Sequence, residues 1–181
     1  ENVGHYSMEN AAELSKIASG HGIELKEHNS DYLPDGLLLS HPALAIGSSN
    51  VAPEFGVEET RAYVTLANLE ETLFARGIVK EKGELLPVLR RSAIATGPWR
   101  KWMVGEAAEY SMDQVLADAA LAALVTDISG HYTFGSAEVA PEIQKLLDNL
   151  ESAHVPARRY VLDRIKASIG RYVTCYNLRG L

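Results

Sequence analysis

Residues 23–32 read IELKEHNSDY, and this stretch decides the fold that the sequence predicts. Its first six residues alternate between apolar and polar side chains and lie between Gly22 and the turn-forming run Asn29-Ser30-Asp31, which is typical of a β-strand. A helical pattern with Ser7 as a suitable N-cap precedes it. Its predicted apolar face is Ala11, Leu14, Ile17 and Ala18.

A second apolar run, residues 43–47, predicts a buried strand. A polar loop over residues 48–56 leads from it into a long predicted helix, residues 57–75. We also expect a short helical turn over residues 33–40, between the two strands. Helix, strand, loop, helix, strand, loop and helix in succession indicate a parallel α/β fold. Because two strands do not make a stable sheet alone, we expect further strands upstream of residue 1.

From residue 77 onward the pattern is helical only. We expect helices near residues 84–95, 98–104, 112–126, 138–152 and 157–176, with Asp118 interrupting the longest apolar run. The chain therefore divides into βα units over residues 1–76 and a helical extension over residues 77–181.

Composition excludes several classes of function. A hydrophobic fraction of 46% and a charged fraction of 23% are ordinary for a globular protein. A net charge of -7 argues against nucleic acid and against an anionic membrane surface as partners. The single cysteine, Cys175, forms no internal disulfide and favours a cytoplasmic location. A structural role for this thiol is favoured over a nucleophilic one.

The strongest candidate site is the polar run Glu27-His28-Asn29-Ser30-Asp31-Tyr32, which follows a strand directly. In parallel α/β barrels the active site lies at the carboxyl ends of the strands. Glu27 and His28 point to opposite sides of the strand because side chains alternate. The alternative interpretation, that His28 and Asp31 only cap a helix and fix a loop, stays open.

A second candidate is the segment 47–56, which also follows a strand. Asn50 can donate to and accept from sugar hydroxyls, and Glu54 can act as an acid, a base or a hydroxyl ligand. The segment has the glycine spacing of neither a Walker nor a dinucleotide-binding loop. An ordinary connecting loop is the alternative.

Three further features carry weaker signals. Residues 127–134 either close over a site or have a structural role. Trp99 and Trp102 flank two cations, and either pack the helical extension or form a phosphate- or partner-binding patch. His5, His28 and His131 could share a metal, although no local ligand pair such as His-x-x-x-His is present.

These stretches resemble the accessory, non-catalytic subunit of class II D-tagatose-1,6-bisphosphate aldolase, a family once described as tagatose 6-phosphate kinases. Residues 27–32 are similar to the family's Glu-Ala-His-Ser-Thr-Asp-Tyr motif. Four more stretches resemble the family in the same order: His5-Tyr6, residues 43–47, the helix through Arg61 and Leu73, and the region from Asp127 to Tyr172. The resemblance spans nearly the whole chain and is weakest between Gly77 and Tyr110.

The resemblance implies an α/β fold, the C-terminal part of a TIM-type (β/α) barrel followed by a helical extension. Apart from the spacing of the motif, where Glu27 directly precedes His28, the chain departs from the family at two places. Ala45-Ile46-Gly47-Ser48 stands where the family has Lys-Val-Gly-Pro, and Asp127-Ile128-Ser129-Gly130-His131-Tyr132 where it has an arginine-rich stretch. Because the lost cations are natural phosphate ligands, we infer an unphosphorylated sugar or sugar acid, or the use of other cations.

We therefore predict a carbohydrate-metabolism protein that binds a ketose sugar or sugar phosphate and supports aldol cleavage. In the enzymatic form, Glu27 or His28 moves a proton, and His5, Asp31, Asn50 and Glu54 hold the substrate. A divalent metal such as Zn would polarise the carbonyl, although the sequence identifies no ligand set.

Two alternatives remain. One is a stand-alone ketose or sugar-acid 4-epimerase or aldolase. The other is a structural scaffold whose partner is a catalytic class II aldolase subunit. A homo-oligomer is compatible with either.

Overall fold

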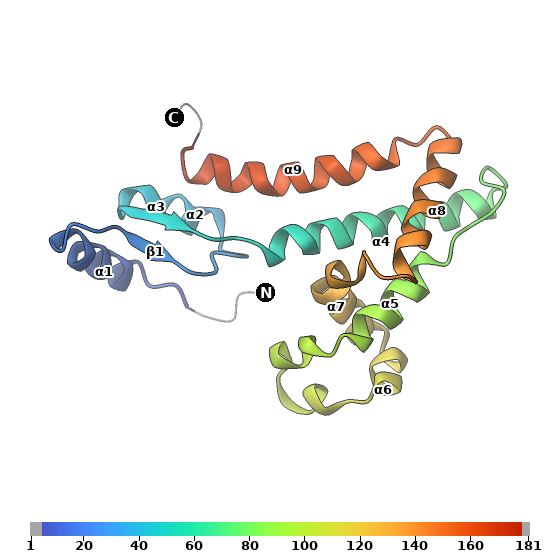
Figure 1. Ribbon diagram of the computed structural model, residues 1–181, viewed down its shortest axis with the longest axis horizontal. Helices are drawn as coiled ribbons and strands as arrows, with labels where there is room; N and C mark the ends of the chain where they lie inside the picture. Colours follow the sequence, from blue (N-terminus) through green and yellow to red (C-terminus); the bar gives the residue numbers. More distant parts are fainter. Residues whose placement is uncertain (1–4, 179–181) are drawn as a thin grey trace. The chain divides into compact units, whose positions relative to one another are not determined.

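The computed structural model describes residues 5–178, which are mainly helical (Figure 1). Helices hold 68% of these residues and strands 4%. The two strands, β1 (Leu25–Glu27) and β2 (Ile46–Ser49), form one parallel pair. The prediction that the N-terminal part belongs to a TIM-type barrel is therefore wrong. A barrel is built from long parallel strands in succession, and the described residues place only this short pair side by side.

The chain divides into two compact units, which are described separately. Unit 1 combines the two ends of the chain, residues 1–55 and 166–181, and unit 2 is the continuous segment 56–165. The helices α4 (Pro53–Ala75) and α9 (Ala157–Cys175) each contribute to both units. These units are defined by compactness alone, so they do not test the functional division predicted at residue 76.

Unit 1 follows the predicted order of helix, strand, helical turn and strand. It contains α1 (Met8–Gly20), β1, α2 (Asp35–Leu38), α3 (Ser40–Ala43) and β2. The Ser7 side chain accepts a hydrogen bond from the Asn10 N–H, which confirms the predicted N-cap. Helix α1 contacts β1, and α3 contacts β2 (Figure 1). The strands thus have helical neighbours, as a parallel pair requires.

The core of unit 1 is small and is formed by residues of the loop after β1, of α2 and of the end of α9. Leu33, Leu38, Tyr172 and Cys175 are its buried members. The predicted apolar face of α1 is only partly correct, because Leu14 and Ile17 are 53% and 59% exposed. Instead α1 buries Ser15, whose hydroxyl donates to the Ala45 carbonyl at 3.2 Å. The sequence pattern missed this because a buried serine interrupts the apolar spacing.

The regular elements of unit 2 are all helices in its described residues, as predicted. Besides parts of α4 and α9 it contains α5 (Leu85–Ala95), η1 (Pro98–Trp102), η2 (Gly105–Glu109), α6 (Met112–Ala117), α7 (Ala119–Ser129), η3 (Gly130–Thr133) and α8 (Val139–Ser152). The helix predicted over residues 112–126 is divided at Asp118. Its carboxylate accepts from the N–H groups of Ala120 and Leu121 and so caps α7.

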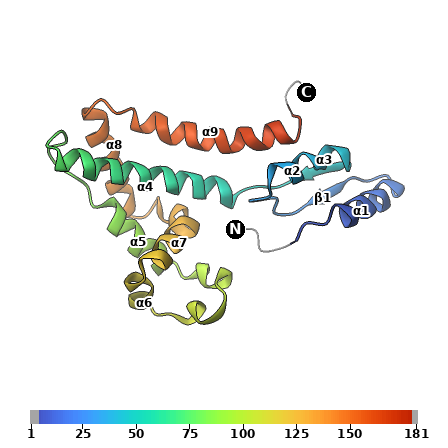
Figure 2. The same cartoon turned by 180° about the vertical axis from the view of Figure 1, so that it is seen from behind.

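Two hydrophobic clusters stabilise unit 2, whose helices α4 to α8 are seen from behind in Figure 2. The larger one joins α4, α5, α8 and the first part of α9. The smaller one joins the end of α5 to η1, α6 and α7, with Trp99 fully buried in it. In residues 5–178, no helix has both the length and the apolar character needed to cross a membrane.

Candidate ligand-binding site

The two polar stretches meet at one edge of the sheet. Glu27 of β1 is in register with Ser49 of β2, so both strands end at the same place. Beyond them the Ser30 N–H donates to the Asn50 carbonyl at 3.1 Å, and Asn50 Nδ2 donates to Asn29 Oδ1 at 3.4 Å. We call residues 28–32 and 50–54 together the rim junction.

Asp31 holds the rim junction to the first turn of α4. Its Oδ1 accepts hydrogen bonds from the backbone N–H groups of Ala52 and Glu54, at 3.1 Å and 2.9 Å. The first N–H groups of a helix have no partner within the helix and carry partial positive charge, so a carboxylate is favourable there. Asp31 thus has the capping role that the sequence left open, but on the helix after β2.

Glu54 is the second buried carboxylate of the rim junction, and it connects three segments of unit 1. Its Oε2 accepts from the Tyr32 N–H at 2.6 Å and from the Tyr172 hydroxyl. Its Oε1 accepts from the Arg171 guanidinium at 2.8 Å. Burial, together with the hydrogen bond to Glu54, raises the pKa of Tyr172. The Tyr172 hydroxyl therefore stays a donor.

Arg171 is the cation that neutralises Glu54, and its guanidinium nitrogens already donate hydrogen bonds within unit 1. Besides Glu54 they donate to Asp35 Oδ1 at 2.5 Å and to the Leu33 carbonyl. Burial lowers the pKa of Arg171, but the hydrogen bond to Asp35 and the charge of Glu54 outweigh burial and raise it. Arg171 is therefore always charged, and its hydrogen bonds stabilise the fold of unit 1.

Two acceptor atoms of the rim junction are buried without a hydrogen-bond partner in the described part of the chain. They are Asp31 Oδ2 and Asn50 Oδ1. Asp31 as a whole is 6% exposed. Asn29 and Tyr32 beside them have left-handed backbones, with φ of 64° and 63°, a conformation that is costly for a tyrosine. Buried acceptors in a strained loop are features of functional sites as well as of structural ones.

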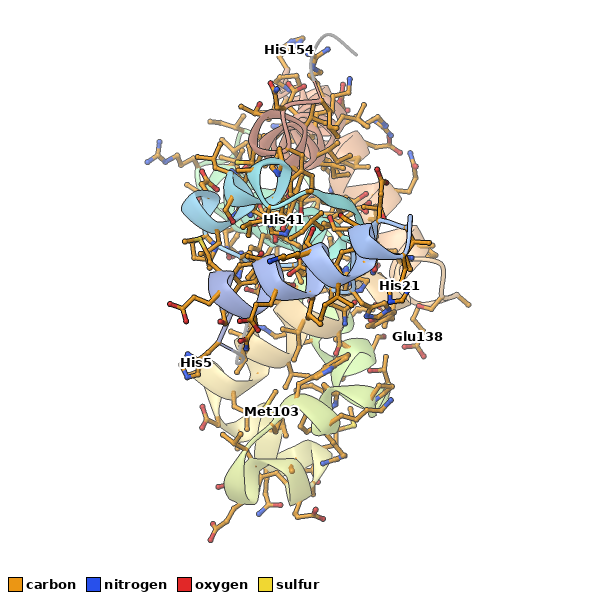
Figure 3. All side chains as sticks on the ribbon, turned by 90° about the vertical axis from the view of Figure 1, so that its left-hand side faces the viewer. His5, His21, His41, Met103, Glu138 and His154 are labelled. Atoms are coloured by element: carbon orange, nitrogen blue, oxygen red, sulfur yellow. The ribbon has the colours of Figure 1, made fainter. Side chains whose placement is uncertain are left out.

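The predicted catalytic residues lie at the end of β1. Glu27 is partly buried and its neighbours Lys26 and His28 are exposed, as the alternation predicts. His5 is exposed in the segment before α1 and lies away from the buried His41 (Figure 3). The structure thus brings Glu27, Asp31, Asn50 and Glu54 to the edge where the strands end. It gives the side chains of His5 and His28 no hydrogen bond among the described residues.

Sequence reasoning missed His41, the partner of Glu27. His41 is 2% exposed and its Nε2 lies within hydrogen-bond distance of Glu27 Oε2, which also accepts from the Ser30 hydroxyl at 2.6 Å. His41 Nδ1 lies 3.0 Å from the Leu37 carbonyl. The sequence SHPA contains no signal for this role, because His41 faces Glu27 only after α2 and α3 have folded back on the strands.

The third predicted segment, residues 127–134, packs within unit 2. Asp127 pairs with Arg61 at 2.9 Å, and His131 lies against Gly56, where a Cβ atom would come within 2.5 Å of the ring. Burial lowers the pKa of His131. These contacts favour the structural role among the two alternatives. Within residues 5–178, no three His, Cys, Asp or Glu side chains are grouped to hold a metal ion, so a bound Zn stays an untested prediction.

A shallow hollow of about 430 Å³ lies beside α9 in unit 1. Asp35, Lys166, Arg171 and Thr174 line it together with Cys175. Cys175 is buried, and burial raises the pKa of its thiol. Since only the thiolate is a good nucleophile, this environment agrees with the structural role predicted for Cys175.

No known protein family, curated protein or solved structure matches this chain. The resemblance to the aldolase accessory subunits therefore stays a prediction. The same resemblance implied the barrel, which is wrong, and nothing in the described residues supports tagatose or aldolase chemistry. What remains is the rim junction itself.

Proposed function

We propose that the rim junction binds a neutral polyhydroxylated small molecule, such as a ketose sugar. The observation that carries this proposal is the pair of buried acceptors, Asp31 Oδ2 and Asn50 Oδ1, which have no partner among residues 5–178. Buried polar atoms are nearly always hydrogen-bonded, and leaving one unpaired costs about 1–3 kcal/mol. Sugar hydroxyls are the donors that two such oxygens need.

Access to these atoms requires a small opening of the rim junction. The hydrogen bond between Asn50 Nδ2 and Asn29 Oδ1 is exposed, and its length of 3.4 Å makes it weak. A ligand that replaces this hydrogen bond breaks only a weak interaction, and its hydroxyls supply donors to both buried acceptors.

The chemistry of the junction favours an unphosphorylated ligand. Acceptor oxygens repel a phosphate group, and Arg171 is already bonded to Asp35, Glu54 and the Leu33 carbonyl. An unphosphorylated ligand also agrees with the sequence, which lacks the cations that the aldolase accessory subunits have at the positions of residues 45–48 and 127–132. A cytoplasmic location, where free sugars are metabolised, belongs to the same proposal.

Ligand binding can be measured by following backbone amide signals in NMR spectra. D-fructose, D-sorbitol and D-gluconate are titrated in turn, with fructose 6-phosphate and Ca²⁺ as separate probes. We expect saturable shifts of the Asp31 and Asn50 amides with the neutral polyols. Asp31→Asn replaces Oδ2 by an N–H donor while Oδ1 still caps α4, so it should weaken binding about tenfold, or 1.4 kcal/mol.

Asp163→Asn is the matched control, because Asp163 is exposed and pairs only with Arg159 within the described part of the chain. It should bind the polyol like the wild type. The proposal fails if no polyol shifts these amides, or if Asp31→Asn binds unchanged. A response to Ca²⁺ alone would identify a cation site instead and would also overturn it.

A second candidate function, self-assembly, is favoured by the exposed side of α1. Leu14 and Ile17 are exposed and lie three residues apart, so they form one stripe. An antiparallel second copy of α1 would cover both apolar side chains, because a two-fold interface brings the same patch of each copy together.

Light scattering after size-exclusion chromatography tests this assembly. The wild type should have the mass of a dimer, and the double variant Leu14→Lys/Ile17→Lys should have half that mass. Met8→Lys is the control, because Met8 is 50% exposed but lies on another side of α1. A monomeric wild type, or a dimer that survives the double substitution, would exclude this interface.

A further inference from the structure

The Glu27–His41 pair has more hydrogen-bond acceptors than a neutral histidine can satisfy. His41 Nδ1 lies 3.0 Å from the Leu37 carbonyl, which can only accept, so Nδ1 must donate. His41 Nε2 faces Glu27 Oε2. A neutral imidazole carries one N–H, and this one is already used at Nδ1. The contact with Glu27 therefore needs a second proton.

The surroundings place this second proton on His41. Glu27 Oε2 also accepts from the Ser30 hydroxyl at 2.6 Å, as expected of a carboxylate. The rings of Tyr6 and Tyr176 lie 5.6 Å and 5.1 Å from the His41 ring, and aromatic rings at such distances stabilise a cation. In the described chain, Glu27 is the one charged group that pairs with His41.

The other titratable groups around the pair do not compete for this role. Tyr6 comes from the segment before α1, and its pKa is raised by burial and by the charge of Glu27, so it stays neutral. Tyr176 follows α9, and its hydroxyl accepts a hydrogen bond from Ser49 at 2.9 Å. Asp35 of α2 is bonded to Arg171. Lys26 and His28 on either side of Glu27 are exposed.

We propose that His41 is held as a doubly protonated imidazolium, and that this proton controls ligand binding at the rim junction. Glu27 is connected to the junction through Ser30, whose hydroxyl donates to Glu27 and whose N–H donates to the Asn50 carbonyl. Loss of the proton leaves a largely buried carboxylate without its cation, which is costly. Ser30 and Asn50 then lose their fixed position, so polyol binding weakens as the pH rises.

The proton is detected directly by nitrogen-15 NMR of the histidine rings. At about pH 7.5, where an ordinary histidine is mostly neutral, both His41 nitrogens should carry protons. The exposed residues His28 and His154 provide reference rings in the same spectrum. In Glu27→Gln, His41 should change to a neutral ring with its proton on Nδ1, because a glutamine amide can donate to Nε2. A neutral His41 in the wild type would overturn the inference.

The effect on ligand binding is measured with D-fructose and rests on the proposed function. Affinity should fall about tenfold as the pH is raised from about 6 to about 9, the range that brackets histidine titration. The affinity of Glu27→Gln should be the same across this range. A doubly protonated His41 without fructose binding would reject the proposed function only, whereas pH-independent binding by the wild type would reject control by this proton.

Discussion

Replacing Glu54 by alanine is expected to lower the free energy of unfolding of unit 1 by about 3–5 kcal/mol. The carboxylate is 8% exposed, and it accepts hydrogen bonds from Tyr32, Arg171 and Tyr172. Without it, the Tyr172 hydroxyl and the Tyr32 N–H lose a buried acceptor, and the guanidinium loses a charged partner. Few single substitutions reach such values, and removal of one partner from a buried charge network is one of them.

The measurement is amide hydrogen exchange in unit 1, combined with urea denaturation followed by circular dichroism. Glu54→Gln keeps the shape and some acceptor capacity, so its loss should be intermediate. Glu13→Ala is the matched control, since Glu13 is exposed on α1 of the same unit, and it should change stability by at most about 0.5 kcal/mol. If Glu54→Ala is as stable as this control, Glu54 is not structural and its predicted role as a sugar ligand gains support.

The pairing of the two strands could be predicted from the sequence because it depends on local signals. Strand-like alternation over residues 23–28, turn residues after it and a second apolar run are enough to predict two parallel neighbours ending at one edge. Helices with strong periodicity, such as α5 and α8, were predicted within a few residues for the same reason. Local chemistry specifies such elements without knowledge of the rest of the chain.

The number of strands could not be derived in this way. Helix–strand alternation over residues 7–75 is equally compatible with a barrel and with a small parallel pair, because the period does not state how many neighbours a strand has. The barrel came from a resemblance in short motifs, and such motifs fix loop geometry rather than architecture. The exposed Leu14 and Ile17 on α1 show the same limit, since spacing predicts an apolar face and not what covers it.

The partners of the site residues depend on contacts distant in sequence. Asp31 and Glu54 were predicted as polar site residues from their position after strands, but Arg171 and Tyr172 reach Glu54 from the other end of the chain. Likewise His41 lies fourteen residues beyond Glu27 and meets it only in the folded chain. Position in a loop indicates that a carboxylate is available. Only the fold shows which groups bind to it.

Replacing Trp99 by alanine is expected to destabilise unit 2 by about 3–5 kcal/mol. Trp99 is fully buried in the cluster of α5, η1, α6 and α7, and its indole N–H donates to the Ile94 carbonyl at 2.8 Å. The Arg100 guanidinium lies 4.3 Å from the ring centroid. Truncation therefore creates a large cavity, leaves a buried carbonyl unpaired and removes a cation–π contact.

Trp102 provides a matched control three residues away in the same short helix, because it is 51% exposed. Trp102→Ala should cost at most about 1 kcal/mol, since little apolar area is removed from a packed environment. Urea denaturation followed by far-ultraviolet circular dichroism compares the two without relying on tryptophan fluorescence. Equal losses from both variants would mean that Trp99 is not a packing residue, and the two tryptophans with Arg100 and Lys101 would then have to be tested as a binding patch.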